Sequence, residues 1–162
     1  MVLSFLYGIR IVYGHALVGI PISTWLLGFS LFFFLGLALS KRCAELYHVK
    51  HNNQVLASRR GYTVEDRRFL ETMGMTISFL SVLVFALYLN SHAAEILYKN
   101  PLLLGGSCIP LLFWLARLWM LTFQGKMDQD PVLFALKDRT SYIVVFIFFT
   151  IVFLAKEGVP WM

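Results

Sequence analysis

Charged residues and cysteines are scarce in this sequence, and each scarcity argues against a class of protein. Only 14% of the 162 residues are charged, against roughly a quarter in an average soluble domain. The two cysteines, Cys43 and Cys108, form no CxxC motif and no Cys/His pattern with metal-ligand spacing. The composition therefore indicates neither a soluble enzyme, nor a disulfide-stabilised domain, nor a zinc site.

Hydrophobic residues are abundant instead, at 59% of the chain, and the mean hydropathy is +0.72. They form five apolar stretches. The length of each can be compared with the ~20 residues that a helix needs to cross hydrocarbon. These stretches cover residues 2–20, 22–40, 72–90, 102–123 and 142–155. The first is too long, and too poor in early basic residues, to predict a removable signal peptide. We therefore predict an all-α integral membrane bundle of about five transmembrane helices, forming one domain over residues 1–162.

The distribution of Lys and Arg predicts the orientation, because these residues accumulate on the cytoplasmic side. The connection 91–101 carries only Lys99. The connection 41–71 carries Lys41, Arg42, Lys50, Arg59, Arg60, Arg67 and Arg68. We expect a bacterial-type inner (plasma) membrane protein with the loops 41–71 and 124–139 in the cytoplasm, and no nucleic-acid partner.

Two arginines lie inside apolar stretches, Arg10 in the first and Arg117 in the fourth. At 1.5 Å per residue, Arg10 lies roughly 13 Å and Arg117 roughly 10 Å from the predicted cytoplasmic ends of their helices. Basic groups at that depth are costly unless they face a partner or a wet cavity, so the pair favours one positively lined cavity that binds phosphate. Alternatively, Arg117 snorkels to the headgroups and Arg10 pairs with a carboxylate.

The segment "SKRCAEL" follows the second apolar stretch directly. Lys41 and Glu45 are one helical turn apart, so with Arg42 they flank the predicted cavity if the helix continues past its membrane end. Arginine binds phosphate through two parallel N–H bonds, lysine adds a mobile charge, and a carboxylate orients either base or holds magnesium. The alternative interpretation is that these charges are only a cytoplasmic border.

The loop 124–139 contains further candidates for phosphate chemistry. They are Asp128 and Asp130 as magnesium ligands, Lys126 and Arg139 as phosphate ligands, and Asp138 or Thr140 as the cap of the last helix. Taken alone, this loop would be a solvated turn. The four histidines are scattered and no third ligand accompanies His48 and His51, so we assign no metal site.

Four segments together resemble the C-terminal half of the UbiA superfamily of membrane prenyltransferases. They are "SKRCAEL", "RGYTVEDRRFLETMG", "SFLSVLVFALYLNS" and "LARLWMLTFQGKMDQDPVLFALKDR". The likeness covers nearly the whole chain and is greatest for the branch similar to decaprenyl-phosphate phosphoribosyltransferase. It implies helices five to nine of a nine-helix bundle around a cavity open to the cytoplasm.

The resemblance also implies a site. Phosphate or diphosphate would be bound by Lys41, Arg42, Arg117, Lys126 and Arg139, supported by Glu45, Asp130 and Asp138. Many superfamily members have an aspartate-rich motif where "SKRCAEL" stands, so the basic residues here favour transfer of a phosphoribosyl group to a polyprenyl phosphate. The family's cofactor is Mg²⁺, but the first aspartate-rich motif, NDxxDxxxD, is absent from this sequence.

Three hypotheses for function follow, with no catalytic residue assigned. The first is a partial UbiA-type transferase acting on polyprenyl (lipid) phosphates, of the phosphoribosyl- or prenyl-transfer type. It would be inactive without the missing N-terminal half, which a separate gene would encode. The second is a non-catalytic membrane scaffold subunit or a decayed fragment. The third is a small transporter of anions or lipid phosphates, which the lack of an internal repeat disfavours.

Overall fold

The computed structural model describes residues 24–51, 67–127 and 131–157, and this part of the chain is helical without a strand. Seven helices are described. They are α2 (Thr24–His51), α3 (Arg67–Leu89), α4 (His92–Leu97), α5 (Pro101–Gly105), α6 (Cys108–Phe123), α7 (Pro131–Lys137) and α8 (Arg139–Glu157).

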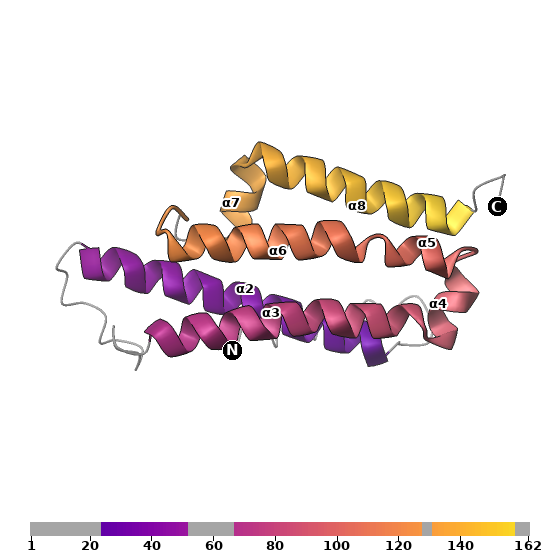
Figure 1. Ribbon diagram of the computed structural model, residues 1–162, viewed down its shortest axis with the longest axis horizontal. Helices are drawn as coiled ribbons and strands as arrows, with labels where there is room; N and C mark the ends of the chain where they lie inside the picture. Colours follow the sequence, from indigo (N-terminus) through magenta and orange to yellow (C-terminus); the bar gives the residue numbers. More distant parts are fainter. Residues whose placement is uncertain (1–23, 52–66, 128–130, 158–162) are drawn as a thin grey trace, which may run out of the picture.

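The long helices run side by side along one axis (Figure 1). The helices α2 and α3 form an antiparallel pair with the most extensive contact in the bundle, α6 packs on this pair, and α8 packs on α5 and α6 at the edge. As a result, α2 and α6 finish at the end of the bundle where α3 and α8 begin (Figure 1, left). We call this the basic end, for the residues given below. The helices α4 and α5 lie at the opposite end.

Four segments of the described residues are long and apolar enough to cross a membrane: Thr24–Tyr47, Arg67–Leu89, Leu102–Phe123 and Arg139–Glu157. They correspond to the last four of the five predicted apolar stretches: the span Leu102–Phe123 has the predicted bounds, and the other three extend past the predicted stretch at one or both ends. The all-α membrane bundle is thereby confirmed. The first predicted crossing, residues 2–20, lies outside the described residues, as does the turn around Pro21.

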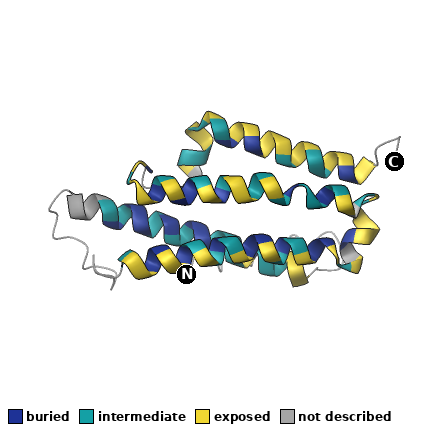
Figure 2. Cartoon of the chain, in the orientation of Figure 1, coloured by how far each residue is buried: buried dark blue, intermediate teal, exposed yellow. Residues whose placement is uncertain are grey.

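The outward faces of the helices are exposed (Figure 2), and many of the exposed residues are large and apolar. On α8, Phe146, Phe149 and Phe153 are 73%, 63% and 62% exposed. On α6, Ile109 is 72% exposed. Contiguous apolar surface of this kind does not suit a soluble protein but matches lipid tails. The helices are therefore integral to the membrane.

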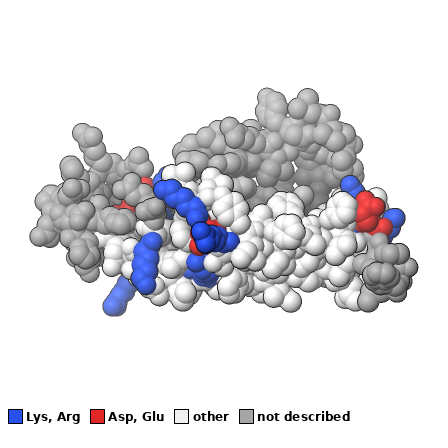
Figure 3. Space-filling view, turned by 90° about the horizontal axis from the view of Figure 1, so that it is seen from above, with Lys and Arg blue, Asp and Glu red and all other residues white. Residues whose placement is uncertain are grey.

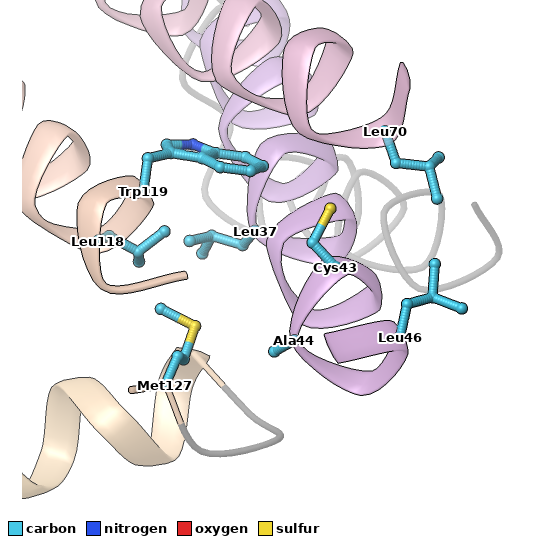
Figure 4. Packing of buried hydrophobic residues seen from close by; sticks show 8 residues of the cluster. All are labelled: Leu37, Cys43, Ala44, Leu46, Leu70, Leu118, Trp119 and Met127. Carbon is cyan, nitrogen blue, oxygen red and sulfur yellow. The ribbon is translucent and has the colours of Figure 1, made fainter. Parts of the chain in front are cut away.

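Two buried apolar clusters hold the helices together, one toward each end. The cluster toward the basic end joins α2, α3 and α6 and consists of Leu37, Cys43, Ala44, Leu46, Leu70, Leu118, Trp119 and Met127 (Figure 4). The cluster toward the other end consists of Phe85, Tyr88, Leu89, Ala94, Leu104 and Ala155. The candidate site described below therefore lies beside a packed core.

Small residues allow α2, α3 and α6 to approach closely. A Cβ atom on Gly36 in α2 would overlap the hydroxyl of Ser78 in α3, and one on Gly74 in α3 would overlap the ring of Trp119 in α6. Because lipid tails are as apolar as the side chains, helices in a membrane associate mainly through such close packing. These positions therefore fix how the three helices cross.

Two predicted connections contain helices that the sequence did not predict. The connection 91–101 contains α4, and the loop 124–139, interpreted as a solvated turn when taken alone, contains α7. Pro131 opens α7 and is buried, which suits the first position of a helix because that position needs no backbone N–H donor. This loop therefore contains ordered structure beside α8.

Candidate anion site at the basic end

Charge is distributed unequally between the two ends of the bundle (Figure 3). At the basic end the described residues include Lys41, Arg42, Arg67, Arg68, Arg117, Lys126, Lys137 and Arg139, against the acidic residues Glu45, Glu71 and Asp138. The opposite end has Lys99 and Lys156 against Glu95 and Glu157. The basic end therefore has a positive excess that would attract anions.

Arg117 of α6 binds the carboxylate of Asp138, the residue before α8. Its Nη1 donates to Oδ2 of Asp138 and its Nη2 donates to Oδ1 at 3.1 Å, so the pair is bidentate. The side chains are only 24% and 15% exposed, and the guanidinium carbon also lies 5.8 Å from the centre of the Phe134 ring. Arg117 therefore does not simply snorkel to the headgroups but joins α6 to the start of α8.

Asp138, one of the two residues that the sequence offered as the cap beside Thr140, caps α8. Its Oδ2 accepts hydrogen bonds from the backbone N–H and the hydroxyl of Ser141, both at 2.9 Å. The Ser141 hydroxyl in turn accepts a 3.0 Å hydrogen bond from Nε1 of Trp114. Burial raises the pKa of Asp138, but the hydrogen bonds from Arg117 and Ser141 outweigh this effect and hold the pKa below its ordinary value of 3.8. The carboxylate is therefore ionised at neutral pH.

The segment "SKRCAEL" is helical throughout, because α2 continues to His51. The predicted extension of this helix past its apolar stretch is confirmed. Within it, Nη1 of Arg42 donates to Oε2 of Glu45 three residues later. Glu45 thus has Arg42 as a partner, although the sequence spacing had drawn attention to Lys41. Both basic residues are partly buried.

A third arginine pair joins α2, α3 and the end of α6, and the sequence analysis missed it. Nε of Arg67 donates to Oε1 of Glu71 at 2.6 Å, and its guanidinium lies 4.8 Å from the ring centre of Tyr47. Tyr47 also contacts Gly125, where an added Cβ would overlap its ring. The spacing of Arg67 and Glu71 on one helical face was the available signal.

Gly125 ends α6 in a Schellman motif. Its φ is 66°, in the left-handed region that favours glycine. Its N–H donates to the carbonyl of Thr122, and the N–H of Lys126 donates to the carbonyl of Leu121, both at 3.1 Å. This turn directs the chain from α6 toward α7 and places Lys126 at the basic end.

The predicted site residues thus fall into three groups. Arg117 and Asp138 are in contact, and so are Arg42 and Glu45. Lys41, Lys126 and Arg139 lie at the same end, the last two exposed. Asp130, Asp128 and Arg10 lie outside the described residues. The predicted convergence of Lys41, Arg42 and Arg117 on one cavity stays a prediction.

The acidic residues described at the basic end do not fit a magnesium site. Glu45, Glu71 and Asp138 each bind an arginine, namely Arg42, Arg67 and Arg117 respectively. Within residues 24–51, 67–127 and 131–157, no group of three His, Cys, Asp or Glu side chains could hold a metal ion. The remaining charged side chains that the structure describes at this end are lysines and arginines.

Two curated proteins match nearly the whole chain. An uncharacterized protein y4nM from Sinorhizobium fredii is 33% identical over 144 residues, which are 88% of this chain and 28% of that protein. The nodulation protein NoeC from Azorhizobium caulinodans is 26% identical over 149 residues, 89% of this chain and 47% of NoeC. The chain thus spans less than half the length of either relative. No family model and no solved structure matches it.

Proposed function

We propose that this chain is part of a UbiA-type membrane transferase that acts on polyprenyl phosphates, of the phosphoribosyl- or prenyl-transfer type. The basic end would face the cytoplasm, as the positive-inside rule favours. The observation that carries the proposal is Arg117, a partly buried arginine in a membrane helix whose guanidinium is held in one orientation by Asp138. The resemblance of the four sequence segments supplies the type of reaction.

The proposed role of the basic end is to bind the phosphate groups of the substrates. Arginine fits phosphate through paired N–H donors, and fixed positive groups in a site of low dielectric stabilise a diphosphate leaving group as its charge develops. In the phosphoribosyl reaction, a polyprenyl phosphate oxygen attacks the anomeric carbon of the sugar while diphosphate leaves. No step is assigned to a metal, because the three acidic residues described at the basic end are each paired with an arginine.

The proposal requires a second part of the enzyme that supplies the NDxxDxxxD motif, because this motif is absent from the sequence. In NoeC, slightly more chain lies outside the match than within it. At ~20 residues per crossing, that remainder is long enough for the four other helices of a UbiA-type bundle. We propose that this chain turns over substrate only together with such a part.

The first test is to inspect the DNA beside the gene for an open frame that encodes four further helices and an NDxxDxxxD motif. The two products are then expressed together, and transfer from phosphoribosyl diphosphate to a polyprenyl phosphate is measured. We expect a lipid-linked sugar phosphate, and a loss of kcat/KM in Arg42→Ala that equals about one charge-assisted hydrogen bond, ~1.5–3 kcal/mol. Lys156→Ala, at the opposite end of the bundle, is the matched control.

The proposal fails if the assembled protein transfers nothing with either a phosphoribosyl or a prenyl donor, or if Arg42→Ala is fully active. In that case a non-catalytic membrane scaffold is the second candidate. Its specific support is that the three described acidic residues of the basic end each bind an arginine, and that the Arg117–Asp138 pair joins α6 to the start of α8 and can serve a purely structural role. A scaffold would still bind its partner chain when Arg42 is replaced.

A further inference from the structure

Four side chains at the basic end form one connected series of hydrogen bonds. Nε1 of Trp114 donates to Oγ of Ser141 at 3.0 Å. The Ser141 hydroxyl donates to Oδ2 of Asp138 at 2.9 Å, and Arg117 donates to both oxygens of Asp138. Because indole can only donate and a hydroxyl has a single proton, the direction of each bond is fixed.

The series leaves one edge of the guanidinium available. Arginine has five N–H donors, and the pairing through Nη1 and Nη2 uses two of them. The Nε–H and the remaining two N–H groups have no acceptor within the described part of the chain. The Arg117 side chain is 24% exposed, and its Nε–H and the outer N–H of Nη2 form this second edge. It has the fork geometry that binds a phosphate oxygen pair.

Ser141 and Trp114 are linked by hydrogen bonds to Arg117 through the carboxylate of Asp138. Ser141 is 1% exposed and lies at the third position of α8, three residues after Asp138. Trp114 and Arg117 are three residues apart on one face of α6, so the indole supports the same carboxylate that Arg117 binds. Without the serine bond, Asp138 would keep only its contacts to Arg117 and to the Ser141 backbone.

We propose that Ser141 and Trp114 are positioning residues for phosphate binding: they hold Asp138, and through it the guanidinium plane of Arg117, so that the open edge receives a phosphate or diphosphate group. The proposal rests on the anion site of the proposed function. A purely structural role for Ser141 and Trp114 would affect stability alone, whereas positioning also affects affinity for phosphate.

The test uses the full-length protein in phosphatidylcholine nanodiscs. Inorganic diphosphate is titrated in one arm, and in the second arm the discs carry a polyprenyl phosphate, detected by exchange of a labelled lipid. The arm with tighter binding identifies the source of the phosphate. In that arm, we expect Trp114→Phe and Ser141→Ala each to weaken binding by about tenfold, the effect of one hydrogen bond in a charged series. The double variant should bind no more weakly than Ser141→Ala, because that change already removes the hydrogen bond from Trp114 together with the bond to Asp138.

Trp119→Phe is the matched control. It makes the same chemical change in the same helix, but the lost 2.9 Å bond goes to Ser78. We expect it to lower the Tm and to leave phosphate affinity unchanged. Ser141→Thr keeps the hydroxyl and should restore most of the affinity that Ser141→Ala loses.

Two results would overturn the positioning proposal, and they differ in whether the anion site also fails. If the wild-type protein binds phosphate and the Trp114 and Ser141 variants bind it equally well, or lose affinity only as Trp119→Phe does, the positioning proposal is overturned and the anion site stands. If the wild-type protein binds neither inorganic diphosphate nor the polyprenyl phosphate, the anion site itself is wrong, and the positioning proposal falls with it.

Discussion

Trp119 in α6 donates a 2.9 Å hydrogen bond from Nε1 to Oγ of Ser78 in α3. The same hydroxyl donates to the carbonyl of Gly74 at 2.8 Å, so it is satisfied within the bundle. On its other side lies Gly36 of α2, where a Cβ atom would overlap the hydroxyl. One small buried residue therefore occupies the point where three membrane helices meet.

Replacing Gly36 by alanine is expected to destabilise the bundle. The added methyl group has no room beside Ser78, and overpacking of this kind costs about 1–3 kcal/mol. Gly28→Ala is the matched control in the same helix, because its Cβ would lie 3.4 Å from Val84, an ordinary contact. Thermal unfolding in detergent measures both variants. Equal Tm values would show that α2 and α3 do not pack as described.

Gly125→Ala is expected to disrupt the turn after α6. Alanine at a φ of 66° is strained, and its Cβ would overlap the Tyr47 ring. The cost should exceed the ~1 kcal/mol that the left-handed conformation alone imposes. Gly105→Ala should have little effect, since its Cβ would lie 3.9 Å from Leu89. A double variant with Tyr47→Ala should recover part of the lost stability, and no recovery would contradict the packing of Tyr47 on Gly125.

The lowered pKa of Asp138 predicts how the stability of the folded protein depends on pH. Its pKa in the folded protein is lower than the ordinary value of 3.8, so the folded state favours the ionised form. The stability that this carboxylate contributes is therefore fully present above 3.8 and is lost as the pH falls through the lower, folded value. The Tm difference between wild type and Asp138→Asn should be constant near neutral pH and shrink in acid. A difference that grows in acid would contradict the pairing with Arg117.

The charge asymmetry predicts the orientation of the bundle in the membrane. Lys126 is exposed at the basic end and Glu95 is exposed at the opposite end. In a variant without the native cysteines, we expect Lys126→Cys to react with an impermeant thiol reagent only after the membrane is opened, and Glu95→Cys to react from outside. The reverse labelling pattern would invert the proposed topology.

The long helices were predictable from the sequence because a membrane imposes a length: ~20 apolar residues mark each crossing. The short helices were not. With 6 residues in α4 and 7 in α7, neither has enough turns to show a hydrophobic period or to be stable alone. They form because the chain around Ser91 and Pro131 packs against longer helices, which is a tertiary effect.

The residues of the candidate site could be proposed from the sequence, but their contacts could not. Asp138 was a candidate cap because caps are local. Its bond to Arg117 spans 21 residues, and that of Trp114 to Ser141 spans 27. Both depend on how α6 and α8 lie side by side. Likewise, Lys41 and Arg42 both lie within one turn of Glu45, so spacing alone did not determine which residue it pairs with.

The placement of small residues between helices and large ones outside has a consequence for sequence divergence. Lipid tails accept any apolar shape, so outward residues such as Phe146, Phe149 and Phe153 can be exchanged for leucine or isoleucine at little cost. Gly36 and Gly74 leave no space for even a methyl group. In diverging lineages, the large residues on the outward faces of this bundle should therefore vary most and the small residues between its helices should vary least.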